Sequence, residues 1–312
     1  MLAEVAAGLA RPQKEVSPKF FYDRRGSELF DAITRLPEYY LTRAERALLE
    51  SFAPAWIADE QPASLVELGA GSADKTRIIL EAMGADGIEP PADHPPIYVP
   101  VDISGEFLKS VAARLRQEYP ALDVRPLVAD ITVSVQKPPR LPGPAVFALL
   151  GSTIGNFKPD NAVRLLARVR RAMGPTDRLL LGVDLKKDRA TLEAAYNDRA
   201  GVTAAFNLNV LNVLNRELDA DFDPDAFEHC AFYSEEHARI EMHLVARRAQ
   251  TVHIPGLEPV RILAGESIRT ELSHKYDRDM VWGLFQAAGL APMGWHTDKD
   301  AVFALAVARK AA

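Results

Sequence analysis

The feature that most constrains the fold is a regular alternation of short apolar segments with amphipathic segments between residues 64 and 183. Short apolar runs bounded by turn residues are typical of strands that are covered on both faces, and strands that alternate with helices form a parallel sheet. The pattern predicts strands at 64–68, 97–101, 123–128, 145–150 and 178–183, and helices at 73–83, 104–118 and 159–173. We therefore expect an α/β fold whose ligands bind at the carboxyl ends of the strands.

The alternation ends after residue 186, and this indicates a second lobe. Residues 187–275 begin as an Asn-rich helical stretch and continue with the strand-like segments ARIEMHLVARR and QTVHIPG. A helix at 278–289 and strands near 294–298 and 301–308 then predict a C-terminal hairpin, so one strand must run antiparallel. We expect a Rossmann-like domain at 43–186 and 276–312, and a second α+β lobe at 1–42 and 187–275.

Composition narrows the classes of partner. The net charge of −6 and the absence of a basic run of five residues disfavour nucleic acid, and no window holds 18 consecutive apolar residues that would span a membrane. The single cysteine, Cys230, excludes an intrachain disulfide and a cysteine-built metal cluster, and the seven histidines show no metal-ligand spacing. The sequence therefore predicts a cytoplasmic protein with a small-molecule ligand and no metal, and the lack of a heptad pattern favours a monomer.

The turn after the first predicted strand, in SLVELGAGSADKT at 64–76, indicates a nucleotide site. Gly69 and Gly71 allow the backbone to turn sharply, and the following helix begins with free N–H groups. A dinucleotide loop of the form GxGxxG needs a third glycine where this chain has Asp74, and an acid there would repel a pyrophosphate. A nucleoside derivative without phosphate fits better, and S-adenosylmethionine (SAM), which carries a sulfonium and no phosphate, meets that condition.

Acidic residues at the ends of the first three strands agree with such a ligand. Glu67, Asp102 and Asp130 are expected to form one rim at the carboxyl edge of the sheet. Asp102 is placed to accept the two ribose hydroxyls, and Asp130 lies where an adenine amino group is expected.

Four further stretches resemble the L-histidine Nα-methyltransferases of ergothioneine biosynthesis. They are SPKFFYDRRGSELFDAITRLPEYYLTRAE at 17–45, LLGSTIGNF at 149–157, AYNDRAGVTAAFNLNVLNVLNREL at 195–218 and GESIRTELSHKY at 265–276. The resemblance implies a class I SAM-dependent methyltransferase with a mostly parallel sheet, an antiparallel C-terminal strand and a separate substrate-binding lobe. It also implies three methylations of the α-amino group of histidine, which give hercynine.

The resemblance assigns roles to individual residues. The cofactor-binding set that it implies is Gly69, Gly71, Lys75, Asp102, Asp130 and Ile131. The substrate-binding set is Tyr39, Asn156, Tyr196, Met242, Glu271 and Ser273, with Tyr22 as the catalytic residue that relays the proton of the amine. Within the second set, Asn156 and Tyr196 are expected to hold the substrate carboxylate, and Glu271 and Ser273 to read the imidazole. Leu41 stands where members of the family often have proline, and the position of His274 varies among them.

Three alternatives remain open at this stage. The first is a methyltransferase of the same family that acts on a thiolated histidine or another aromatic amino acid. Glu271 distinguishes it, because an imidazole N–H needs an acceptor there and a different substrate would not require one. A SAM or amino-acid sensor without turnover is a different class of protein. An NAD-dependent oxidoreductase is disfavoured by Asp74.

Overall fold

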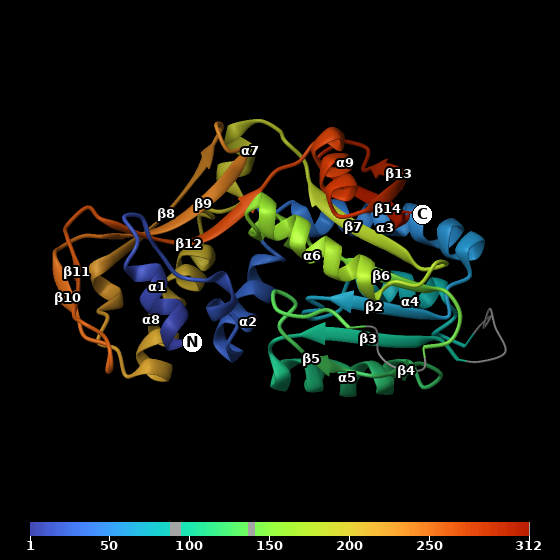
Figure 1. Cartoon of the computed structure of the whole chain (residues 1–312), viewed down its shortest axis with the longest axis horizontal. Helices are drawn as coiled ribbons and strands as arrows, with labels where there is room; N and C mark the ends of the chain where they lie inside the picture. Colours follow the sequence, from blue (N-terminus) through green and yellow to red (C-terminus); the bar gives the residue numbers. More distant parts are fainter. Residues whose placement is uncertain (88–94, 137–140, 312) are drawn as a thin grey trace. The chain divides into compact units, whose positions relative to one another are not determined.

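The computed structural model describes residues 1–87, 95–136 and 141–311, which divide into two compact units. Unit 1 comprises Met1–Tyr40 and Lys187–His274, and unit 2 comprises Leu41–Lys186 and Lys275–Ala312. Each unit is therefore built from two separate stretches of the chain. In Figure 1 the colours show this directly, because each unit combines an early and a late part of the sequence.

Unit 2 contains a mostly parallel sheet, and the predicted α/β class is confirmed. Its strands are β2 (Ser64–Leu68), β3 (Ile97–Asp102), β4 (Asp123–Val124), β5 (Leu127–Val128), β6 (Ala145–Leu149), β7 (Arg178–Asp184), β13 (Leu290–Thr297) and β14 (Phe303–Lys310). The order is β13-β14-β7-β6-β2-β3-β4, with β5 also paired to β3. The pairs from β7 to β4 are parallel, whereas β14 runs antiparallel to both β7 and β13, as the predicted C-terminal hairpin requires.

The strand expected at 123–128 is interrupted. It forms two short pieces, β4 and β5, each paired in parallel with β3. Pro126 lies between them, and a proline has no backbone N–H to donate to a ladder. The apolar pattern alone did not reveal this break.

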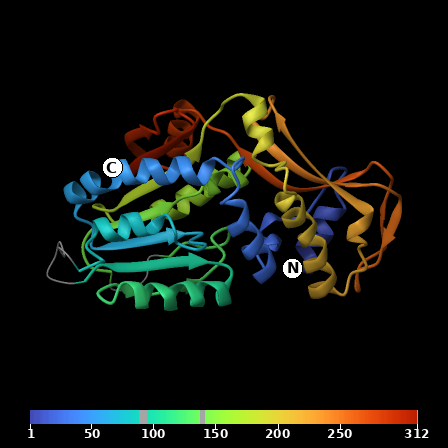
Figure 2. The ribbon, with the colours of Figure 1, turned by 180° about the vertical axis from the view of Figure 1, so that it is seen from behind.

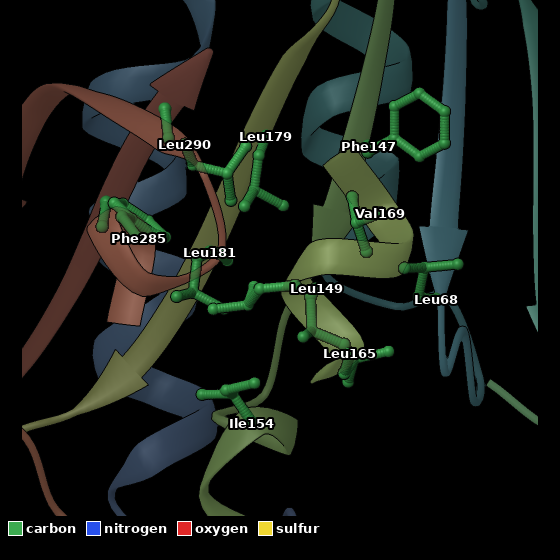
Figure 3. Packing of buried hydrophobic residues seen from close by; sticks show 14 of the residues in the cluster. Leu68, Phe147, Leu149, Ile154, Leu165, Val169, Leu179, Leu181, Phe285 and Leu290 are labelled. Atoms are coloured by element: carbon green, nitrogen blue, oxygen red, sulfur yellow. The ribbon is translucent and has the colours of Figure 1, made fainter. Parts of the chain in front are cut away.

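Helices cover both faces of the unit 2 sheet. They are α3 (Leu41–Glu60), α4 (Thr76–Ala82), α5 (Gly105–Glu118), α6 (Pro159–Ala172) and α9 (Arg278–Ala287), with the short 3-10 helix η2 (Thr153–Asn156). One apolar cluster joins the sheet to α6 and α9, and the other joins it to α3, α4 and α5. Figure 3 shows part of the first cluster, where Leu149 and Leu181 from the sheet meet Leu165 and Phe285 from the helices. Figures 1 and 2 both show α5 running alongside β3.

Successive residues of one strand enter different clusters, and this explains the unbroken apolar runs in the sequence. In β2, Val66 and Leu68 belong to the cluster with α6, whereas Leu65 belongs to the cluster with α3. Because both faces of the sheet are covered, both sets of side chains must be apolar.

Unit 1 is an α+β structure. Its strands are β1 (Lys14–Glu15), β8 (Phe227–Ser234), β9 (Arg239–Ala246), β10 (Gln250–Val252), β11 (Val260–Ile262) and β12 (Ser267–His274). Its helices are α1 (Leu2–Leu9), α2 (Arg24–Ile33), α7 (Arg189–Ala194) and α8 (Val202–Leu218), with the 3-10 helices η1 (Pro18–Phe21) and η3 (Pro224–Ala226).

The main sheet of unit 1 has the order β1-β12-β9-β8, and β10 and β11 form a separate hairpin. The N-terminal β1 pairs in parallel with β12, and the remaining pairs of the sheet are antiparallel. The helix α8 packs against β8, β9 and α2. The sequence pattern did not predict β8. Within the described ranges, no helix is long and apolar enough to cross a membrane.

Candidate functional site

The glycine turn after β2 requires its glycines. Gly69 has φ +74° and Gly71 has φ +52°, the left-handed region that side chains disfavour. A Cβ added at Gly71 would meet nothing within 4 Å, so the backbone conformation, not crowding within the protein, selects glycine there. Ala73 also lies in this region, at φ +56°. The loop therefore exposes its backbone beside open space.

Asp102, the last residue of β3, fastens this loop. Its Oδ2 accepts a hydrogen bond from the Gly71 amide at 3.1 Å, and its Oδ1 accepts one from the Ser104 amide at 2.9 Å. Each carboxylate oxygen has two lone pairs, so both oxygens retain the capacity to accept a further hydrogen bond from a ligand hydroxyl.

The next strand end carries Asp130 and Ile131. Asp130 Oδ1 accepts a hydrogen bond from the Thr132 amide at 2.8 Å and also bonds the Thr132 hydroxyl, and Ile131 packs partly buried against the core. The sequence thus folds this segment into a turn in which one carboxylate oxygen is held by the backbone.

Apolar side chains stay exposed around these strand ends. Ile103 is 41% exposed, Val128 is 53% exposed and Val133 is 70% exposed. Val128 lies opposite Asp102 in the β3–β5 register, and a Cβ on Gly105 would come within 3.4 Å of it. Exposed apolar surface next to hydrogen-bonding carboxylates is what a nucleoside needs, because its base is flat and its ribose is polar.

Glu67 does not lie on this rim, so that prediction is wrong. Its side chain is 3% exposed and bonds two hydroxyl groups: Thr76 Oγ1 lies 2.8 and 2.7 Å from its two oxygens, and the Tyr98 hydroxyl donates to it as well. Burial raises the pKa of Glu67 to about 7. Residue 67 faces into unit 2, so the carboxylate holds β2, β3 and α4 together.

Lys75 is paired with an acid that sequence reasoning overlooked. Its ammonium contacts the carboxylate of Glu45, which is fully buried. The same carboxylate accepts the Gly151 amide at 2.8 and 3.0 Å, and a Cβ on Gly151 would come within 3.4 Å of Lys75 Nζ. Glu45 thus connects α3, the turn after β2 and the turn after β6.

Asn156 ends η2, in a segment that three contacts hold. Besides the Glu45 contact at Gly151, Ser152 Oγ accepts the Asp184 amide at 2.9 Å, and the Tyr276 hydroxyl donates to Ile154 O at 3.3 Å. The segment that carries Asn156 is therefore fixed at its beginning and in its middle.

In unit 1, the three predicted tyrosines belong to one aromatic cluster. Tyr22 makes edge contacts with Phe30 and Phe206, each with ring centroids 5.8 Å apart. Phe30 contacts Tyr39 at 6.4 Å, and Tyr39 contacts Tyr196 at 6.2 Å. These rings come from α2, α8 and the segments after η1, α2 and α7, so the folding of unit 1 brings them together.

Glu271, Ser273 and Met242 share one face of the unit 1 sheet. Glu271 lies opposite Met242, and Ser273 lies opposite Ile240, across the antiparallel β12–β9 pair. Residues directly opposite in such a pair project to the same face. The Tyr196 hydroxyl bonds Ser273 Oγ at 2.8 Å, which connects this face to the aromatic cluster. The resemblance stated above assigns the following residues to the substrate, and we call them the substrate face of unit 1: Tyr22, Tyr39, Tyr196, Met242, Glu271 and Ser273.

Comparison with known proteins decides the family. The family model described as "Histidine-specific methyltransferase, SAM-dependent" matches residues 1–310. The chain belongs to this family.

Several curated relatives agree with that family. The histidine N-alpha-methyltransferases of Mycolicibacterium smegmatis and Mycobacterium tuberculosis are 43% and 42% identical to this chain; each comparison covers 98% of the chain, and 93% and 94% of the relatives. The ergothioneine biosynthesis protein 1 of Neurospora crassa is 29% identical over 89% of the chain, which corresponds to 31% of that protein.

A solved structure supports the class of fold. Magnesium protoporphyrin IX methyltransferase from Synechocystis PCC 6803, determined with bound SAH, superposes with a TM-score of 0.50 at 9% identity, covering 94% of this chain and 98% of that one. At this identity the likeness concerns the fold alone, and it agrees with the predicted class I methyltransferase architecture.

The family membership makes this chain a SAM-dependent methyltransferase. Sequence reasoning correctly placed Asp102 at the end of a strand and Gly69 and Gly71 in a turn. It missed Glu45, and it missed Thr270 and Asn207, which hold the strand that carries Glu271. Glu45 gave a weak signal as an acid among the buried positions of the helix at 41–60. Among the described residues, no group of three or more histidines, cysteines and acids is arranged to hold a metal ion.

Proposed function

We propose that this methyltransferase transfers three methyl groups to the α-amino nitrogen of L-histidine and so produces hercynine. The observation that carries the proposal is the substrate face of unit 1, where a carboxylate (Glu271) and a hydroxyl (Ser273) share one face and the hydroxyl is bonded to Tyr196. Such a pair matches the two nitrogens of an imidazole. In this proposal unit 2 binds SAM and unit 1 recognises the amino acid, with the domains at 43–186 plus 276–312 and at 1–42 plus 187–275.

The residues at the strand ends of unit 2 fit SAM. When bound, SAM supplies a methyl group on a sulfonium, which an amine can attack in line. Asp102 accepts the ribose hydroxyls while the Gly71 and Ser104 amides hold its carboxylate in place. Asp130 and Ile131 border the adenine together with exposed Val128. Gly69 and Gly71 leave room for the methionine part, and Lys75 supports the loop through Glu45.

Recognition of histidine rests on paired hydrogen bonds. Glu271 accepts the imidazole N–H, and Ser273, oriented by Tyr196, bonds the other ring nitrogen. A site built to pair with a ring N–H disfavours side chains that lack one, because the hydrogen bond between Glu271 and the ring is then not made. Met242, which is 2% exposed, lines the face beside Glu271. Asn156 and Tyr196 are assigned to the substrate carboxylate.

The tyrosines suit an amine that becomes a permanent cation. The attacking nitrogen must be neutral, and the hydroxyl of Tyr22 is assigned to receive or relay its proton. The faces of Tyr22 and Tyr39 stabilise the growing positive charge through cation–π attraction. Phe30 packs between these two rings and fixes their orientation, so the same surface serves all three transfers.

We further propose that the enzyme acts as a monomer in the cytoplasm on a free amino acid. The single thiol, Cys230, is compatible with a reducing compartment. Light scattering of the purified protein across a tenfold range of concentration tests the monomer, because a dimer would double the measured mass.

Mass spectrometry of reactions with SAM tests the activity. The purified protein is incubated with SAM and, in separate reactions, with histidine, a thiolated histidine, tryptophan and tyrosine. We expect only histidine to gain mass, up to three methyl groups. Methylation of another amino acid in place of histidine would reject the substrate, and binding of SAM without any turnover would reject the enzyme in favour of a sensor.

A matched pair of variants tests the role of Glu271. In Glu271→Gln the charged acceptor is replaced by an amide of the same shape, and we expect kcat/KM for histidine to fall about 100-fold, since a hydrogen bond to a charged group is worth roughly 3 kcal/mol. Glu236→Gln makes the same change at an exposed position of unit 1 and should leave kcat/KM within twofold. Equal effects of the two variants would contradict the assignment.

A further inference from the structure

The faces on which Glu271 and Ser273 lie depend on one irregularity of β12. Arg269 lies opposite His243, but Glu271 lies opposite Met242, so Thr270 is an extra residue without a partner in the ladder. This is a β-bulge, which re-aims the side chains that follow it. Continued without the bulge, the register of Arg269 would place Glu271 opposite Glu241.

That alternative register would turn the strand over. Arg269 Nη1 lies 3.4 Å from Glu241 Oε2, so Arg269 and Glu241 share the face opposite to Met242. A one-residue shift moves every later side chain of a strand to the other face. Glu271 and Ser273 would then leave the face that Tyr196 contacts, and two carboxylates would stand directly opposite each other.

A buried asparagine of α8 holds the bulged residue. Asn207 is fully buried, and its Oδ1 accepts a hydrogen bond from Thr270 Oγ1 at 2.6 Å; the same hydroxyl also lies 3.1 Å from Met242 O. Its Nδ2 donates to the backbone oxygen of His243 at 3.0 Å, on the strand that faces the bulge. One side chain thus bonds both strands at the irregularity, from a helix 63 residues earlier than Thr270.

The second hydrogen of the same amide goes to His229. Asn207 Nδ2 lies 2.9 Å from His229 Nδ1, and His229 Nε2 lies 2.8 Å from Tyr196 O. Because an amide nitrogen can only donate, Nδ1 must accept, and the proton of the neutral ring is on Nε2, where it is donated to Tyr196 O. Burial lowers the pKa of His229 and so favours this neutral form, although the hydrogen bond to Tyr196 O and the charge of Asp198 act in the opposite direction.

We propose that Asn207, bonded to Thr270 and His229, is a positioning residue that sets the substrate specificity of this enzyme by fixing the bulge in β12 and the backbone at Tyr196. The first branch is the bond to Thr270, which places Glu271 and Ser273. The second branch is the bond to His229, which places the backbone of Tyr196, whose hydroxyl bonds Ser273. The inference rests on the proposed function, because it concerns the residues that are assigned there to the imidazole.

Thr270→Val tests the first branch because it keeps the shape of the side chain and removes its hydrogen-bond donor. We expect kcat/KM for histidine to fall about 10-fold or more, while kcat/KM for phenylalanine, whose ring has no N–H, stays as low as in the wild type. The dissociation constant for SAM should change less than twofold. Thr270→Ser, which keeps the hydroxyl, should restore most of the preference for histidine.

Thr34→Val is the control for lost stability. Thr34 lies in unit 1, and its hydroxyl donates a hydrogen bond to Asp31 O at 2.7 Å, so the same substitution removes a hydrogen-bond donor away from β12. It should leave the ratio of the two kcat/KM values unchanged. An equal loss of that ratio in both threonine variants, or an unchanged ratio in Thr270→Val, would overturn the proposal.

Two measurements do not depend on turnover. In the crystal structure of Thr270→Val, we expect Glu271 to leave its place opposite Met242 or to become disordered; an unchanged register would overturn the role of the bulge. Nitrogen-15 spectra of the wild type should show His229 protonated at Nε2 alone, and protonation at Nδ1 would overturn the second branch. If wild-type protein does not methylate histidine, the proposed function fails, whereas these two results still decide whether the Thr270 hydroxyl fixes the register of β12 and whether His229 accepts the Asn207 amide.

Discussion

The strand-end site of unit 2 and the substrate face of unit 1 are constructed in different ways. In unit 2, the backbone makes the key contacts: the amides of Gly71 and Ser104 hold Asp102, and the Gly151 amide is held by Glu45. In unit 1, side chains hold side chains: Tyr196 bonds Ser273, and Asn207 bonds Thr270.

The difference shows which part of the molecule tolerates change. A site made by backbone amides keeps its geometry when most neighbouring side chains vary, because every residue carries the same N–H group. A site made by pairs of side chains depends on both members of each pair. We therefore expect substitutions of residues such as Asn207 and Thr270, which hold the substrate face, to alter specificity. Substitutions in the strand-end site of unit 2 should weaken SAM binding at only a few positions.

The largest effect is expected at Asp102. Its replacement by alanine removes the proposed acceptor of the ribose hydroxyls and leaves the Gly71 and Ser104 amides without this carboxylate. We expect the affinity for SAM to fall about 100-fold or more, equivalent to roughly 3 kcal/mol, as measured by titration calorimetry.

Asp198 provides the matched change in unit 1. Its carboxylate also accepts two backbone amides, from Val202 at 2.9 Å and Thr203 at 2.7 Å, where it caps α8. Asp198→Ala should cost about 1–2 kcal/mol of unfolding free energy, as the loss of a helix cap does, and should not change the affinity for SAM. If both variants weakened SAM binding equally, the contrast between the two regions would not hold.

The next largest effect concerns two buried carboxylates, one in each unit, whose pKa values are shifted in opposite directions. Glu67 bonds the neutral hydroxyls of Thr76 and Tyr98, and burial raises its pKa from 4.5 to about 7. Glu241 is also buried, but the hydrogen bonds from Arg239 and His243 and the charges of Arg239 and Arg269 outweigh the effect of burial and lower its pKa to about 2.

These shifts predict opposite responses to pH. Above pH 4.5 the folded chain holds the Glu67 proton more tightly than the unfolded chain, so its contribution to stability declines as the pH rises to about 7. Relative to wild type, Glu67→Gln should therefore gain about 2–3 kcal/mol of unfolding free energy between pH 5 and pH 8. Urea unfolding at several pH values measures this gap, and a gap independent of pH would contradict it.

Glu241→Gln is the companion variant. The folded pKa of Glu241 lies below its ordinary value, so the carboxylate stabilises the folded chain above pH 4.5 and this contribution declines as the pH falls toward 2. The variant should be less stable than wild type by a constant amount between pH 5 and pH 8.

The smallest effect compares two glycines. Gly71 in unit 2 and Gly201 at the start of α8 both have positive φ, +52° and +73°, and a Cβ on either would meet nothing within 4 Å. Alanine at each position should cost about 1–2 kcal/mol of unfolding free energy through backbone strain alone. Only Gly71→Ala should also weaken SAM binding; if Gly201→Ala did the same, the open space at Gly71 would not be special.

The extent to which the sequence predicted the molecule follows from the same contrast. The strands of unit 2 are predictable because they are apolar runs. The places of Asp102 and Asp130 follow from the ends of the predicted strands, because the carboxyl ends of parallel strands lie at one edge of the sheet. The burial of Glu67 was missed because the sequence pattern does not show whether the side chain at the end of a strand points into the core or toward the ligand.

The substrate face was less accessible to such reasoning. The bulge at Thr270 changes the face of Glu271, and no alternation in the sequence signals an extra residue. In the sequence, Asn207 is one of several asparagines in a predicted helix, and nothing there distinguishes it. In the structure it is fully buried and bonds residues on two strands. The resemblance to a family, not the pattern, suggested Glu271 and Ser273.

The division of each unit into two chain segments has a consequence for synthesis. In unit 1, β12 (Ser267–His274) lies between β1 and β9, and in unit 2, β14 (Phe303–Lys310) lies between β13 and β7, so each sheet has an inner strand that comes after residue 266. Neither sheet is complete until the ribosome has made those residues. A protein with an independent N-terminal domain can fold that domain while translation continues. For this chain, we expect both sheets to stay incomplete until β12 and β14 have been synthesised, and a stop codon before β12 to leave neither unit able to fold.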